Sequence, residues 1–438
     1  MEWWLLLSLM IFSILALMFI RLPVAFAFLA VNIGAYIILL GGGRGLEQLI
    51  RNVDNALTTF ALTPIPFFIL MGEIAFHSGT APKMIEALDN WFGRIPARLS
   101  LLSVGGGTSL ATLTGSSISS IAVLGSTLLP DMERRGYKRP LSMGPIMGSG
   151  GLAVLIPPSA LGVLLASLSQ ISVGQFLIAI VVPGILTAVL LALYVIARSV
   201  VNPELAPKYE PGSVSLAEKL KLTAQYILPL AIIVFLVIGL IILGVATPTE
   251  AAAMGVVGSL LLAALDGELN RRTITKALRE TLKITTMILF LVAGSAAFSQ
   301  ILAFTGAANQ LVRFVSGLDA STLIILIAMQ LIVLVMGTFM EPVSIMLITL
   351  PIFVPIAEAL GFDMLWFATL LLVNIEVGMI SPPFGLGLFA MKATAPEDTT
   401  MAQVYSAAIP ICLLYIAVMA ILITVPGLVT WLPSVMAE

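Results

Sequence analysis

The sequence predicts an all-α polytopic membrane protein with two inverted-topology repeats, each containing a re-entrant hairpin and a broken helix. Three observations predict this fold: the hydrophobic composition, a set of helix-breaking motifs that occurs twice, and an uneven distribution of Lys and Arg. Of the 438 residues, 59% are hydrophobic and 10% are charged, and the mean hydropathy is +1.11. Because the apolar runs are continuous and do not alternate as β-barrel strands do, they predict about ten to twelve helical crossings of ~20 residues.

The first apolar run, residues 3–20, is predicted to be a retained helix. Glu2 stands where a signal peptide would carry basic residues, and no small-residue cleavage site follows. Residues 44–56 and 80–98 mix charged with apolar positions, which is typical of amphipathic helices. Cys412 is the sole cysteine of the chain, so an internal disulfide and a cysteine-based metal site are excluded.

Helix-breaking and small polar residues occur in the same order in both halves. The first set comprises Thr114–Ser117, Pro130, Gly136, Gly148–Gly151 and Pro157-Pro158-Ser159, and the second comprises Gly337-Thr338, Pro351, Gly361, Asn374–Gly378 and Ser381-Pro382-Pro383. Gly136 precedes Pro157 by 21 residues, and Gly361 precedes Pro382 by the same 21. Such breakers inside hydrophobic sequence, placed alike in two halves, indicate a transporter binding site.

The duplication divides the chain into two repeats and a linker. We expect repeat 1 at residues 1–198, a cytoplasmic linker at 199–222 and repeat 2 at 223–430. The expected hairpins are at about 99–130 and 321–360, the broken helices at about 141–170 and 365–391, and an amphipathic helix at 268–283 precedes a crossing at 284–304. The arms of the first hairpin are too short to cross. The second could cross twice by its length, and only the repeat indicates re-entry.

The positive charges assign an orientation to this layout. With the N-terminus in the periplasm, 18 of the 21 Lys and Arg fall on the cytoplasmic side, and only Arg44, Arg51 and Arg313 fall outside. An excess of Lys and Arg in cytoplasmic loops is the usual bias of membrane proteins. The first hairpin then enters from the cytoplasm and the second from the periplasm, which makes the repeats inverted.

The polar breaks predict two cation sites. A broken helix exposes carbonyl oxygens that suit a small hard cation, and hydroxyl oxygens add to them. The first candidate set is Thr114, Ser116, Ser117, Ser149, Gly150 and Gly151, and the second is Gly337, Thr338, Asn374 and Gly378, near Glu341. The alternative is that these small residues only allow close helix packing, and the mirrored positions favour the cation sites.

A substrate carboxylate is expected beside these sites. Helix N-termini offer N–H groups to an anion, and the candidate substrate residues are Ser116, Pro158, Ser159, Glu341 and Pro383. The carboxyls of Glu341 and Glu376 would lie at membrane depth, where they either serve the function or are held protonated or hydrogen-bonded. Glu250 either caps its helix or gates the site, and His77 is expected to be a solvated helix-end residue rather than a proton relay.

These motifs resemble the large membrane (M) subunit of the tripartite ATP-independent periplasmic (TRAP) transporters over essentially the full chain. The resemblance rests on Arg21-Leu22-Pro23, on residues 110–117, on Leu155–Ser159, on Thr247-Pro248-Thr249-Glu250-Ala251-Ala252-Ala253 and on Ile380–Gly385. It implies a sodium-coupled secondary transporter in the bacterial inner membrane that imports small organic acids. It also implies a small four-helix membrane subunit, not fused to this chain, and a periplasmic substrate-binding protein.

The resemblance also implies residue roles and a mechanism. Ser116, Ser117 and Ser149–Gly151 correspond to ligands of one sodium ion, and Thr338, Asn374 and Gly378 to ligands of another. The fold is similar to other ion-transporter families with paired hairpins, in which a transport domain slides as an elevator against a scaffold. Two or more sodium ions would therefore be the coupling ions.

Other function classes have weaker support. An intramembrane enzyme is disfavoured because the chain has one His, no G-x-S-x-G and no Walker A lysine. A channel or a two-component ion-coupled anion carrier that needs no binding protein is the alternative. The expected partners are the lipid bilayer and the two TRAP proteins, with no nucleic acid.

Overall fold

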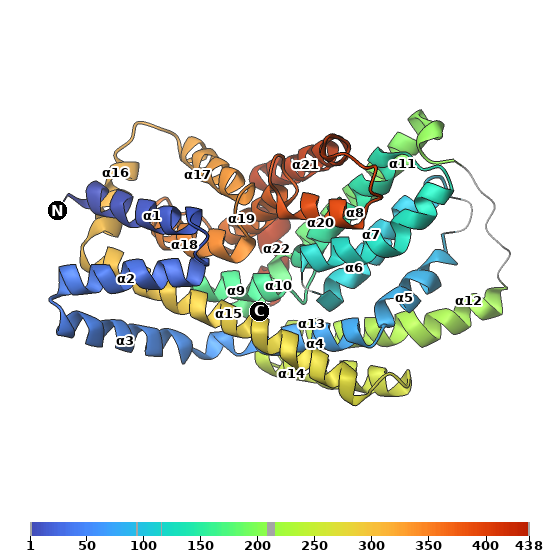
Figure 1. The fold of residues 1–438 in the computed structure, drawn as a ribbon, viewed down its shortest axis with the longest axis horizontal. Coiled ribbons are helices and arrows are strands. Elements are labelled where there is room, and N and C mark those ends of the chain that lie inside the picture. Colours follow the sequence, from blue (N-terminus) through green and yellow to red (C-terminus); the bar gives the residue numbers. More distant parts are fainter. Residues whose placement is uncertain (1, 93–94, 115, 208–214, 437–438) are drawn as a thin grey trace.

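Helices form every regular element in the part of the chain that the structure describes (Figure 1). The computed structural model describes residues 2–92, 95–114, 116–207 and 215–436, without the side chains at 81, 110–114 and 436. Within these residues, seven helices are long and apolar enough to cross a membrane, or eight if one bent pair is counted as one span. Four further apolar helices have only 16–17 residues, so the count of full-length spans is below the expected ten to twelve. The all-α polytopic prediction is confirmed.

One group of helices includes the long helix α15. Its members are α1 (Trp3–Phe19), α2 (Val24–Leu40), α3 (Gly43–Leu57), η1 (Phe60–Leu62), α4 (Pro64–His77), α5 (Thr80–Asp89), α12 (Leu216–Leu222), the π-turn η3 (Thr223–Ile227), α13 (Leu228–Ile242), α14 (Pro248–Leu265), α15 (Arg271–Phe304) and α16 (Ala307–Ser316). In Figure 1, α15 extends between the end of the molecule that holds α2 and α3 and the region of α4 and α14. It packs against α2, α3 and α4.

The second group carries the predicted hairpins and broken helices. Its members are α6 (Arg98–Thr114), α7 (Ser117–Arg134), α8 (Arg139–Leu155), α9 (Ala160–Leu168), α10 (Val173–Ala179), α11 (Val181–Val201), η2 (Pro203–Leu205), α17 (Thr322–Gly337), α18 (Pro342–Ala359), α19 (Met364–Met379), α20 (Leu386–Thr394), α21 (Met401–Thr424) and α22 (Gly427–Met436). Helix α8 packs against α6, α7 and α21, and α19 packs against α17, α21 and α8. The core of this group is therefore α8 and α19.

Two glycines end equivalent helices in the same way. Gly136 (φ 78°) follows α7 and Gly361 (φ 72°) follows α18, a conformation in which a side chain would be strained. After Gly136, the N–H of Tyr137 bonds back to Met132 O at 3.0 Å, and after Gly361 the N–H of Phe362 bonds to Ala357 O at 3.0 Å. Both turns are Schellman caps, and they lead directly into α8 and α19.

The first helix break begins near the end of the predicted range 148–158, and the second lies after the predicted range 374–378. We expected unwound backbone at Ser149–Gly151 and at Asn374–Gly378, but α8 and α19 are continuous through these residues. The chain leaves α8 at Ile156 (φ −105°, ψ 115°), immediately before Pro157-Pro158, and it leaves α19 at Ile380, before Pro382-Pro383. The prolines decide the position because they lack the N–H of a helix and force the preceding residue out of it, whereas a buried glycine only weakens a helix.

Two further boundaries differ from the sequence prediction. The expected linker at 199–222 is shorter, because α11 extends to Val201 and α12 continues through η3 into α13 as one helix. The expected separate helices at 268–283 and 284–304 are the single 34-residue α15. Asn270 caps α15 by accepting a hydrogen bond from Thr273 N at 2.9 Å, and no Gly or Pro follows before Gly294. The repeat limits, their inversion and the periplasmic N-terminus stay predictions.

Candidate functional site

The two predicted hairpins are helix pairs whose tips lie beside α8 and α19. Helix α6 ends at Thr114 and α7 begins at Ser117, while α17 ends at Gly337 and α18 begins at Pro342. The tip of the second pair packs on α19 and the first pair packs on α8. Gly115 and the side chain of Thr114 lie outside the described residues. Polar residues at the described tips and the helices beneath them form the candidate site.

Ser117 joins the first tip to the second half of the chain. Its hydroxyl donates a hydrogen bond of 2.6 Å to Glu376 Oε2, across 259 residues of sequence. Glu376 is 2% exposed, and its other oxygen, Oε1, has no hydrogen-bond partner among the described residues. Ser116 is the N-cap of α7, where its hydroxyl accepts from Ser119 N at 3.4 Å. The first tip therefore contacts α19 directly.

The Ser149–Gly151 segment provides close packing rather than free carbonyls. Ser149 Oγ donates to Pro145 O at 2.6 Å and to Ile146 O at 3.1 Å. A Cβ added to Gly150 would lie 2.5 Å from Ile121 Cγ1 and 3.1 Å from Ser117 O, and one added to Gly151 would overlap the hydroxyl of Tyr415. The absence of side chains here lets α7 and α21 approach α8.

The second tip contacts α19 through a pair of glycines and an amide network. A Cβ added to Gly378 would lie 2.5 Å from the Cα of Gly337. Asn374 Nδ2 donates to Gln330 O at 2.5 Å and to Gln330 Oε1 at 2.9 Å. Thr338 Oγ1 donates to Val335 O in its own helix at 2.8 Å. Gly337 of the second tip thus meets Gly378 of α19, while Asn374 meets Gln330 of α17, and a cation site at these residues stays a prediction.

The candidate substrate residues lie at helix starts. Glu341 caps α18, accepting from Ser344 N at 3.0 Å and from Ser344 Oγ at 2.6 Å. Ser159 is buried and caps α9 by accepting from Gly162 N at 3.0 Å. The carbonyl of Pro383 accepts from Tyr405 OH at 2.8 Å. Pro157-Pro158 and Pro382-Pro383 are both joined by cis peptide bonds.

The proline pairs leave carbonyl oxygens without their helical donors. In an α-helix the N–H of residue i bonds to the carbonyl of residue i−4. Pro157 and Pro158 have no N–H, so Ala153 and Val154 lack that donor, and Pro383 likewise supplies none to Met379. All three residues are buried. Buried carbonyls of this kind at the ends of half-helices are the oxygen donors that fit sodium in a membrane transporter.

Several residues that contact the candidate site were not identified from the sequence. Tyr415 was overlooked, although its hydroxyl donates to Gly148 O at 2.6 Å. Gln330, a lone amide in an apolar helix, gave a signal that was not used. The sulfur of Cys412 lies 3.6 Å from Ser381 Oγ at the second break.

Two other polar residues lie away from the tips. Glu250 accepts from Thr247 N at 2.8 Å in a capping box, which supports the capping role over gating. His77 contacts Glu73 across one helical turn, at 3.3 Å from Nε2 to Oε2. Within the described residues, no group of three or more His, Cys, Asp or Glu could hold a metal ion.

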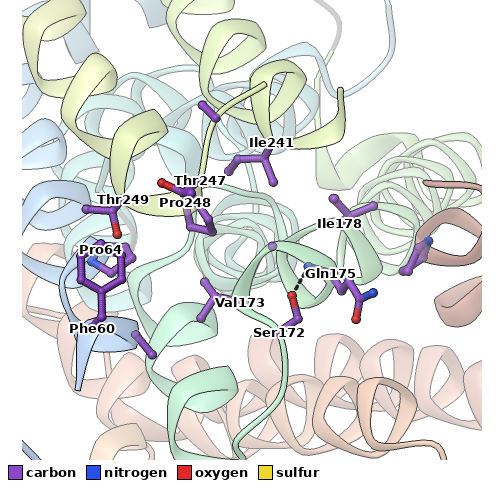
Figure 2. Close-up of a pocket in the computed structure, with 14 residues that line it drawn as sticks. Phe60, Pro64, Ser172, Val173, Gln175, Ile178, Ile241, Thr247, Pro248 and Thr249 are labelled. Atoms are coloured by element: carbon purple, nitrogen blue, oxygen red, sulfur yellow. Dashed lines mark hydrogen bonds between the residues drawn. The ribbon is translucent and has the colours of Figure 1, made fainter. Parts of the chain in front are cut away.

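A pocket of about 400 Å³ opens between the two helix groups (Figure 2). Figure 2 shows Thr247, Pro248 and Thr249 at the start of α14 facing residues at the start of α10, with Phe60 and Pro64 on one side. Ile178 and Ile241 line this pocket and also line a smaller one that reaches Pro157 and Pro158. The two cavities share these two lining residues, and the smaller one borders the first proline pair.

The sequence profile of one protein family matches nearly the whole chain. The family is described as "Tripartite ATP-independent periplasmic transporter, DctM component", and the match covers residues 11–428. The chain belongs to this family. A DctM component is part of an ATP-independent, and hence secondary, membrane transporter, which agrees with the polytopic fold and with the expectation of a transporter rather than an enzyme.

Named relatives and solved structures agree with membership in the DctM family. The chain is 32% identical over 404 residues to the C4-dicarboxylate TRAP transporter large permease protein DctM of Pseudomonas aeruginosa, covering 92% of each chain. It is 27% identical to the ectoine TRAP transporter large permease protein TeaC of Halomonas elongata, covering 88% of this chain and 90% of TeaC. The fold is similar to that of MtrF of Neisseria gonorrhoeae, with a TM-score of 0.60, 13% identity and coverage of 87% and 84%.

Proposed function

We propose that this DctM-family chain is the large permease of a sodium-coupled importer of small organic acids in the bacterial inner membrane. The observation that carries the proposal is the meeting of the first tip with α19, where Ser117 Oγ lies 2.6 Å from the buried carboxylate of Glu376. The Ser117 hydroxyl comes from the first half of the chain and the Glu376 carboxylate from the second. In transporters with alternating access, the binding site lies at such an interface between two halves. A small four-helix membrane subunit and a periplasmic binding protein complete the transporter.

Sodium follows from the charge and chemistry of the tips. Residues 99–130, 141–170, 321–360 and 365–391 contain no Lys or Arg, so no basic side chain of these segments neutralises an anionic substrate. Hydroxyls and helix-end carbonyls are hard donors, which suit a hard cation. Cations bound at Ser116 and Ser117, and at Thr338, Asn374 and Gly378, would supply the missing charge.

The substrate is a small carboxylate bound at helix starts beside the sodium ions. The related permeases are named for C4-dicarboxylates and for ectoine, and both substrates are small organic acids. Backbone N–H groups at the start of α7 and α9 offer donors to a carboxylate, which makes Ser116 and Ser159 the proposed polar contacts in the first half, with Pro158 beside Ser159 as an apolar one. Glu341 and Pro383 are the proposed contacts in the second.

Import is tested in vesicles that contain all three components. The purified chain with its small membrane subunit is reconstituted, and the binding protein loaded with a radiolabelled C4-dicarboxylate is added outside. We expect accumulation with an inward sodium gradient and background uptake when potassium replaces sodium. Uptake that ignores the sodium gradient would contradict the coupling, and uptake without the binding protein would favour a two-component carrier.

The pocket in Figure 2 is the proposed path between the surface and the site. In an elevator mechanism the helices carrying the tips move against a scaffold such as α4, α13 and α14, and this pocket lies at that boundary.

A large side chain in this pocket is expected to block transport. Gly174 lines it, and an added Cβ would lie 3.4 Å from Ile241 Cγ2 and 3.8 Å from Pro248 Cγ. We expect Gly174→Trp to fold but to lose at least about tenfold in uptake, because an indole fills the space between the moving surfaces. Leu261→Trp, at a 60% exposed position on α14, is the control and should transport normally. Equal rates for the two variants would exclude this path.

A further inference from the structure

We infer that Glu376 is a carboxylate ligand of one coupling cation, and that this ion joins the two halves of the chain. The inference rests on the proposed function and adds to it a charged residue that lies outside the predicted hydroxyl and carbonyl sets. Glu376 lies in α19, in the second half, and its hydrogen-bond partner Ser117 begins α7, in the first half. A cation held between them would touch both.

The hydrogen bonds of Glu376 leave half of its carboxylate unsatisfied. Oε2 accepts from Ser117 Oγ, while Oε1 has no partner among the described residues and is shielded from solvent. A carboxylate can accept about four hydrogen bonds, and a buried one without a partner is costly. The side chain therefore needs a proton or a cation at Oε1.

The neighbours of Glu376 do not supply that partner. The hydroxyl of Tyr415 is nearby, but its proton is donated to Gly148 O at 2.6 Å. Within the described residues, Glu376 takes part in no ion pair with Lys, Arg or His. At Gly151, an added Cβ would lie 3.3 Å from Glu376 Oε2, so this glycine keeps side-chain atoms away from the carboxylate.

The chemistry of these groups selects a small monovalent cation. One carboxylate balances one positive charge, and the Ser117 hydroxyl that contacts it is a second hard oxygen donor. Divalent and transition metals are held by more carboxylates or by His and Cys, and the described residues contain no such cluster. Sodium at Glu376 would draw α7 and α19 together, so that filling this site also orders the helix that carries Asn374 and Gly378.

The test measures sodium binding directly as well as transport. We compare wild type with Glu376→Gln, and use Glu358→Gln, an exposed carboxylate at the end of α18, as the control for loss of one charge. The readouts are the sodium concentration for half-maximal thermal stabilisation of the purified protein and the sodium dependence of uptake in the three-component vesicles. We expect Glu376→Gln to raise the half-saturating sodium concentration at least tenfold, and Glu358→Gln to leave it unchanged.

The outcomes separate this inference from the proposed function. An unchanged sodium affinity in Glu376→Gln, with a sodium-dependent wild type, would overturn the inference alone and make Glu376 a protonated packing residue. If sodium changes neither the thermal stability nor the uptake of the wild type, the sodium coupling and the inference are both overturned. If Glu376→Gln does not fold, Glu376→Asp and Ser117→Ala serve instead. Both should weaken sodium binding severalfold, and unchanged affinity in both would overturn the inference.

Discussion

Replacing Gly378 by Ala is expected to destabilise the protein and to abolish most of its transport. An added Cβ would lie 2.5 Å from the Cα of Gly337, a distance that side-chain rotation cannot relieve because the opposing atom belongs to the backbone. Overpacking of a buried site costs about 1–3 kcal/mol, and here α17 and α19 must separate. The measurement is the midpoint of thermal denaturation in detergent, together with uptake in vesicles.

The reciprocal variant and an open glycine provide the controls. Gly337→Ala would place its Cβ 2.6 Å from the Cα of Gly378, so it should lower the midpoint by a similar amount. The double variant should cost less than the sum of the two, because the first substitution already separates the helices. Gly34→Ala, where nothing lies within 4 Å of an added Cβ in α2, should be neutral or slightly stabilising. Equal midpoints for Gly34→Ala and Gly378→Ala would refute the packing argument.

Local signals in the sequence predicted the features that depend on neighbouring residues. Thr247 and Glu250, three residues apart, form the capping box at the start of α14, and Pro248 is the first residue of that helix. Gly136 and Gly361 were among the predicted helix-breaking residues, and both have the positive φ that favours glycine. Continuous hydrophobic runs predicted helices, and every regular element of the described chain is helical. These features are decided within a few residues of the chain.

Breaks were predicted less well because two kinds of residue compete as helix breakers. Glycines at 148, 150 and 151 suggested unwound backbone, yet α8 continues through them, since burial against α7 and α21 more than offsets their low helix propensity. The proline pairs, a few residues later, end both helices because their effect is steric and removes a donor. The same reasoning moves the carbonyls that lack a helical donor from Ser149–Gly151 to Ala153 and Val154.

Contacts between the halves could not be predicted from the sequence. Ser117 and Glu376 are 259 residues apart, and Tyr415 and Gly148 are 267 apart. Hydrophobic periodicity identifies the buried face of an amphipathic helix, but α8 and α19 are buried nearly all round and have no preferred face. The single acidic residue of α19, Glu376, indicates a functional position. Its presence does not tell which residue of the other half will be its hydrogen-bond partner.

Replacing Pro157 and Pro158 together by Ala is expected to remove sodium-dependent uptake while the protein stays folded. Helices α8 and α9 are bent by 50° at this pair. Two alanines restore N–H groups that can bond to the carbonyls of Ala153 and Val154, so a continuous helix can form here without the cost of about 3 kcal/mol that a proline imposes in a helix interior. The straightened helix would move Ser159 and would use the carbonyls that we assign to the cation. We expect uptake to fall at least about tenfold, because the discontinuous helix is the proposed ion site.

The second half offers an equivalent test, and an unrelated proline offers the control. Pro382→Ala with Pro383→Ala should reduce uptake in the same way if both halves contribute a site, since Met379 would regain its helical donor. Pro410→Ala, inside the continuous helix α21 rather than at a break, also restores a helical N–H and should leave uptake and sodium dependence unchanged. If the first pair can be replaced without loss while Pro410→Ala behaves as expected, the carbonyls at the end of α8 do not bind sodium. If only the first pair matters, the cation site belongs to the first tip and Glu376, and the second break serves to position α20.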